Sequence, residues 1–73
     1  MNATSEKEKL EADIQIIVNF LNTSLFEEVV KKTTPLIKKY PDTYILKNLL
    51  ALAYNGLNKY DLALDTLDKA IKY

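Results

Sequence analysis

The chain has 73 residues, enough for one small domain, and contains neither Cys nor His. Disulfides, zinc sites with thiolate or imidazole ligands, and Cys or His nucleophiles are therefore excluded. Ten Lys balance ten acidic residues and there is no Arg, whereas nucleic-acid binders usually carry a basic excess rich in Arg, so we expect no nucleic-acid partner.

Other common classes of function also lack a signal. The longest apolar run, Leu49 to Tyr54, is too short to span a membrane, and the first ten residues mix Glu and Lys instead of forming a secretory signal. One Gly cannot build a phosphate-binding loop. Acidic residues near the start fit the amino end of a helix better than a metal or acid–base site. These are Glu6, Glu8, Glu11 and Asp13. We expect a cytoplasmic, non-enzymatic protein with no membrane span, no metal and no cofactor.

The first two expected helices begin at capping-box patterns. Ser5 with Glu8 opens the first, which ends at residues 22–24. Its apolar stripe is wide, which predicts burial on two sides. The stripe comprises Leu10, Ile14, Ile17 and Leu21, flanked by Ile16 and Phe20. Ser24 with Glu27 opens the second helix, and Pro35 is expected to kink that helix or end it early.

The last two helices follow Pro41. Asp42 or Thr43 can cap the third, which is the most apolar segment and should be central. Gly56 and Asn58 are expected in left-handed conformations at its end. Asn58 with Asp61 can cap the fourth helix. Its apolar face comprises Tyr60, Ala63, Leu64, Leu67, Ala70 and Ile71.

The second pair of helices repeats the first with an offset of 34 residues. This offset aligns Ile16 with Leu50, Phe20 with Tyr54, Phe26 with Tyr60, Val29 with Ala63, Val30 with Leu64, and Ile37 with Ile71. A 34-residue helix–turn–helix period is the spacing of tetratricopeptide (TPR) repeats.

The second unit resembles this family in its motifs as well. Leu50 and Ala51 followed by Tyr54 match the family's Leu–Gly/Ala–x–x–Tyr, and residues 58–61 look like its Gly–Asp–Tyr–Asp turn. The resemblance implies an all-α fold of two antiparallel helix–turn–helix repeats (four helices), a fragment of a TPR-like α-solenoid. We expect a single domain over 1–73, with repeat one at about 10–43, repeat two at about 44–73, and a short N-terminal extension, 1–9. It also implies that Tyr54 and Tyr60 are core residues.

In this family the first helix of each pair lines a concave peptide-binding groove. The resemblance implies a groove made of Ile14, Val18, Leu21, Ile45, Asn48, Leu52 and Asn55. Asn48 and Asn55 could pair with the backbone of an extended peptide, or be ordinary solvated residues. The leading hypothesis is a module that binds a protein or peptide with an apolar or amphipathic segment.

The alternative hypothesis is a self-assembly module that forms a homodimer through its last helix. The apolar residues left for self-association or for a following repeat are Leu57, Leu62, Leu64 and Ile71. A further open question is the Lys cluster at 31, 32, 38 and 39, which indicates either an acidic partner or a solvated face.

Overall fold

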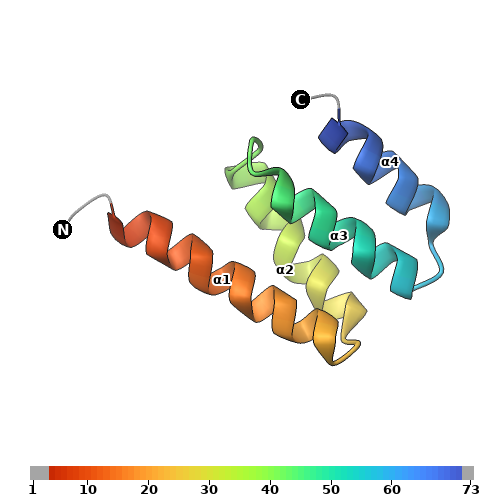
Figure 1. The fold of residues 1–73 in the computed structure, drawn as a ribbon, viewed down its shortest axis with the longest axis horizontal. Helices are drawn as coiled ribbons and strands as arrows, with labels where there is room; N and C mark the ends of the chain where they lie inside the picture. The colour runs from red at the N-terminus through yellow and green to blue at the C-terminus, as the bar shows by residue number, and fades with distance from the viewer. Residues whose placement is uncertain (1–3, 72–73) are drawn as a thin grey trace.

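The chain forms four helices and is all-α, as expected, in a computed structural model that describes residues 4–71, with side chains for 6–68. The helices are α1 (Thr4–Asn22), α2 (Phe26–Lys39), α3 (Tyr44–Gly56) and α4 (Tyr60–Ile71). Consecutive helices run in opposite directions (Figure 1). The expected N-terminal extension contributes its residues 4–9 to α1, which begins before Ser5.

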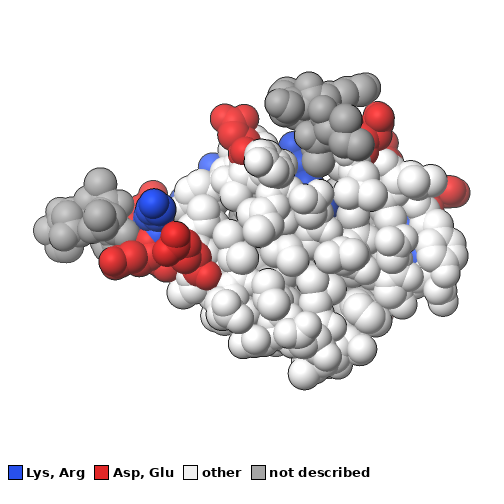
Figure 2. All heavy atoms as spheres, in the orientation of Figure 1, with Lys and Arg blue, Asp and Glu red and all other residues white. Residues whose placement is uncertain are grey.

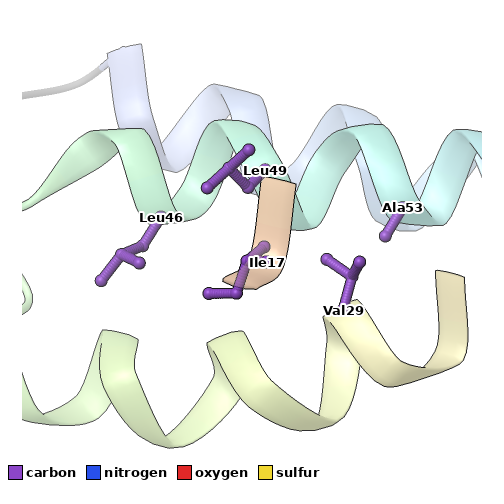
Figure 3. Packing of buried hydrophobic residues seen from close by; sticks show 5 residues of the cluster. All are labelled: Ile17, Val29, Leu46, Leu49 and Ala53. Atoms are coloured by element: carbon purple, nitrogen blue, oxygen red, sulfur yellow. The ribbon is translucent and has the colours of Figure 1, made fainter. Parts of the chain in front are cut away.

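Helix α3 is central, because it contacts each of the other three helices. Helix α1 also contacts α2, so α1, α2 and α3 share one core. Figure 3 shows the side chains at its centre pointing toward one another from these three helices. They are Ile17 of α1, Val29 of α2, and Leu46, Leu49 and Ala53 of α3. Each large apolar side chain in this core contributes about 1.5–3 kcal/mol relative to its exposed state.

The two turns within the helix pairs have the same geometry. Ser24 and Asn58, 34 residues apart, have φ values of 62° and 63°. The next amide donates to the carbonyl five residues earlier: Leu25 N to Phe20 O and Lys59 N to Tyr54 O, both at 2.8 Å. The left-handed residue itself donates to the carbonyl three residues earlier, at 3.0 Å in both turns. Each turn is therefore a Schellman motif, which satisfies carbonyls that the helix end leaves free.

This geometry makes the predicted capping role of Ser24 wrong. Leu25, not Ser24, directly precedes α2, and it makes no side-chain cap hydrogen bond. Thr43 precedes α3 and likewise makes none. Asn58 is left-handed as expected, but it lies two residues before α4 and ends the previous turn. The pattern of Ser24 followed by Glu27 predicts the start of a helix, but Ser24 belongs to the turn that ends α1.

Of the two effects expected from Pro35, the early end of α2 is wrong, because the helix continues to Lys39 and its later residues Leu36 and Ile37 pack against the core. The expectation for α1 is also corrected. Helix α1 is not buried on two sides: Ile17 is fully buried but Ile16 is 40% exposed. Among the described residues, only α2 and α3 contact α1.

Candidate protein-binding surfaces

Helix α3 leaves one stripe of its surface open, beside a buried face formed by Leu46, Leu49, Leu50, Ala51 and Ala53. Ile45 and Leu52, one heptad apart on this stripe, are 45% and 55% exposed. Asn48 and Asn55 lie between and beyond them and are also exposed. A helix places residues spaced three, four and seven apart on one face, so these four predicted groove residues share a surface.

The predicted groove residues of α1 lie closer to the core. Ile14, Val18 and Leu21 are half-buried and pack against the core cluster. Because α1 and α3 contact each other, the two stripes lie on neighbouring helices. None of the predicted groove residues is charged, and Figure 2 shows a largely uncharged surface over the middle of the molecule, with charged side chains at its margins.

Two of the hollows in the surface lie at helix turns. One of about 250 Å³ is lined by residues 24–28 at the start of α2 and by Leu57. Another of about 310 Å³ is lined by residues 58–62 at the start of α4. The lining segments are 34 residues apart, so the hollows are equivalent positions in the two units. The 34-residue offset in the sequence could have shown that these two hollows are equivalent, whereas the residues predicted for the groove include none that line them.

The apolar residues expected on the last helix pair are placed differently from one another. Leu62 and Leu64 are 46% and 67% exposed. Leu57 is half-buried and lines hollows beside α2. Ile71 ends α4, and its side chain is outside the described residues.

Tyr60 is not the core residue that the sequence predicted. It is 58% exposed, and its hydroxyl donates a hydrogen bond to Asn58 Oδ1 at 2.7 Å. Its equivalent in the first unit, Phe26, is half-buried and packs against the core cluster. The difference arises because α3 covers Phe26, whereas no described helix covers Tyr60.

Most of the Lys cluster on α2 is paired with carboxylates. Lys32 Nζ lies 3.2 Å from Asp13 Oδ1 of α1, and Lys39 Nζ lies 3.8 Å from Glu6 Oε2. Lys31 Nζ lies 3.9 Å from Glu28 Oε2 on its own helix. These pairs offset much of the local positive charge, which favours a solvated face over a site for an acidic partner.

The described residues show neither of two other kinds of site. Across residues 4–71, no group of three or more acidic side chains is arranged to hold a metal ion. Within the same range, every helix is too short or too polar to cross a membrane. Comparisons of the chain with protein-family models, with curated proteins and with solved structures found no match.

Proposed function

We propose that the chain is a non-catalytic, TPR-like protein-binding module that holds an apolar peptide segment on the stripe of α3 and the neighbouring stripe of α1. The observation that carries this proposal is the exposure of Ile45 and Leu52, at 45% and 55%, on the central helix. Three leucines of α3 on its other faces, Leu46, Leu49 and Leu50, are buried, whereas Ile45 and Leu52 are left open to water between Asn48 and Asn55. Binding a partner would remove the exposed apolar area from water.

The spacing on α3 favours an extended ligand. Seven residues of helix separate Ile45 from Leu52 by about 10 Å. Three residues of a polyproline-type extended peptide span about 9 Å and return to the same face. Apolar side chains three residues apart would therefore meet Ile45 and Leu52 together. Asn48 and Asn55 are exposed beside them, and each amide can both donate to and accept from a peptide backbone.

The repeat geometry supports the same class of function. The matching Schellman turns at Ser24 and Asn58 agree with the 34-residue period of TPR proteins. Repeat proteins of this type use extended surfaces for binding.

The test is a peptide array in which two Leu or Phe residues occupy positions i and i+2, i and i+3, or i and i+5 of an otherwise polar peptide. We expect the three-residue spacing to bind best. In ¹⁵N-labelled protein, the amide shifts should change along α1 and α3. Leu52→Lys should weaken binding at least tenfold.

The matched control is Ile16→Lys, because Ile16 is 40% exposed but lies on another face of α1. This variant should bind the selected peptides within twofold of the parent. Equal weakening by both substitutions, or shift changes confined to α4, would assign the binding to another surface and overturn the proposal.

A further inference from the structure

The second unit, α3 and α4, carries an open face whose counterpart in the first unit, α1 and α2, is covered. Phe26 and Val30 of α2 are half-buried against the core cluster, to which α3 contributes Leu46, Leu49 and Ala53. The equivalent residues of α4, 34 positions later, are Tyr60 and Leu64. They are 58% and 67% exposed. We call Tyr60 and Leu64 the open face.

The hollows at the turns show the same difference. In the first unit, Leu57 from the end of α3 closes one side of the hollow lined by residues 24–28. The equivalent hollow, lined by residues 58–62, has lining residues from its own turn and helix alone among the described residues. Among the described residues, therefore, the open face lacks the covering helix that α3 supplies to Phe26 and Val30.

Helix α3 shows what kind of helix fits such a position. Its residues toward the first unit are Leu46, Leu49 and Ala53, which are at most 7% exposed and have the spacing i, i+3 and i+7. At i+10 lies Gly56, where an added Cβ would be 2.5 Å from ring carbons of Phe26. A helix can cross this aromatic ring closely only if it has no side chain at that point.

From this template we propose that the open face binds an amphipathic helix of a partner protein in the pose that α3 takes on the first unit. The partner helix has the pattern Leu-x-x-Leu-x-x-x-Ala-x-x-Gly, with its Gly where it crosses Tyr60. This surface is distinct from the proposed groove on α1 and α3, and it takes a helix, not an extended segment.

A second copy of the chain fits this face poorly. Its α3 is already used by its own first unit. At the positions equivalent to Leu46, Leu49 and Ala53, its α1 has Ala12, Gln15 and Asn19, all of which are exposed. Gln15 Nε2 donates to Asn19 Oδ1 at 3.5 Å, so stacking α1 on the open face would bury a polar pair against Leu64. A symmetric contact between two α4 helices lacks a Gly for crossing Tyr60, because residues 60–71 contain none.

The experiment uses a synthetic peptide with the sequence of residues 43–57 as the probe. Ile45 and Leu52 are replaced by Lys in the peptide, since both are exposed on α3 and the change improves its solubility. Binding to the full chain is measured by fluorescence anisotropy, and helix formation by circular dichroism. We expect micromolar binding accompanied by a gain in helicity. Leu64→Glu in the protein should weaken binding at least tenfold, and Gly56→Leu in the peptide should do the same.

Ile16→Glu is the matched protein control, because Ile16 is exposed but lies on α1. It should change binding less than twofold. Sensitivity to Leu64→Glu also separates docking on α4 from displacement of the protein's own α3 by the peptide. Absence of binding at millimolar peptide, binding that is indifferent to Leu64→Glu, or a stable dimer held through α4 would each overturn the proposal. None of these outcomes bears on the extended-peptide groove, which the array tests independently.

Discussion

The ring of Phe26 lies directly over Gly56, so close that an added Cβ would be 2.5 Å from two of its carbons. This contact joins the start of α2 to the end of α3 and therefore links the two units. Gly56 was expected to be left-handed, but it is helical and its φ is not positive. Its role is to allow close packing, and the left-handed residue of this turn is Asn58.

Gly56→Ala should therefore lower the free energy of unfolding by about 1 kcal/mol. The helix-propensity gain of up to ~1 kcal/mol is outweighed by overpacking against the ring, which typically costs about 1–3 kcal/mol. Urea unfolding followed by circular dichroism measures the change. In a Phe26→Ala background the same substitution should become neutral or stabilising, because the ring is gone. An unchanged effect in that background would show that the Phe26 contact is not the cause.

Ser24→Gly should stabilise the protein by about 0.5–1 kcal/mol. Ser24 has φ 62°, a conformation that costs about 1–2 kcal/mol for a residue with a Cβ and little for Gly. Thr23→Gly is the control one residue earlier, where φ is not positive. It should destabilise, because Thr23 Oγ1 donates to Asn19 O at 3.0 Å and Gly adds flexibility to the unfolded chain. If both Gly substitutions lower the melting temperature, the left-handed strain at Ser24 is not the dominant effect.

Pro35→Ala should raise the free energy of unfolding by up to about 3 kcal/mol, the difference between Pro and Ala inside a helix. Pro35 is exposed and lies within α2, so the ring contributes little packing to offset its missing N–H. Thr34→Ala, also exposed, is the control and should change stability by less than about 0.7 kcal/mol. Destabilisation by Pro35→Ala would instead mean that a kink at Pro35, as the sequence predicts, helps Leu36 and Ile37 to reach the core.

The four helices and the 34-residue offset could be predicted from the sequence because they depend on apolar periodicity and on a comparison of the chain with itself, although the capping residues could not. The 34-residue register aligns the ends of α1 and α3 at Asn22 and Gly56, and the starts of α2 and α4 at Phe26 and Tyr60. The most apolar segment was correctly expected to be central, since burial on several sides requires apolar residues on several faces. These features need no knowledge of which helix lies beside which.

What could not be predicted depends on neighbours. Tyr60 and Phe26 occupy equivalent positions, but among the described residues only Phe26 is covered by a helix. The family motif therefore assigns Tyr60 to the core wrongly. Ile16 is 40% exposed for the same reason, because no described helix packs on that side of α1. Ser24 and Glu27 match a capping box, but a Schellman turn competes for the same residues and prevails.

The sharpest test of this inequality between equivalent positions compares Val30→Glu with Leu64→Glu. Val30 is half-buried against the core, and burying an unpaired carboxylate there should lower the free energy of unfolding by about 2–3 kcal/mol. Leu64 is 67% exposed, and the same substitution should change stability by less than about 0.5 kcal/mol. Chemical unfolding of both variants measures the two changes in stability. Sedimentation across a range of concentrations measures whether the protein is a monomer or a dimer. If Leu64→Glu proves as costly as Val30→Glu and also converts a dimer to a monomer, the last helix is buried against a second copy in solution and the self-assembly alternative holds. A monomeric parent with a tolerant Leu64 would leave that face open for a different helix.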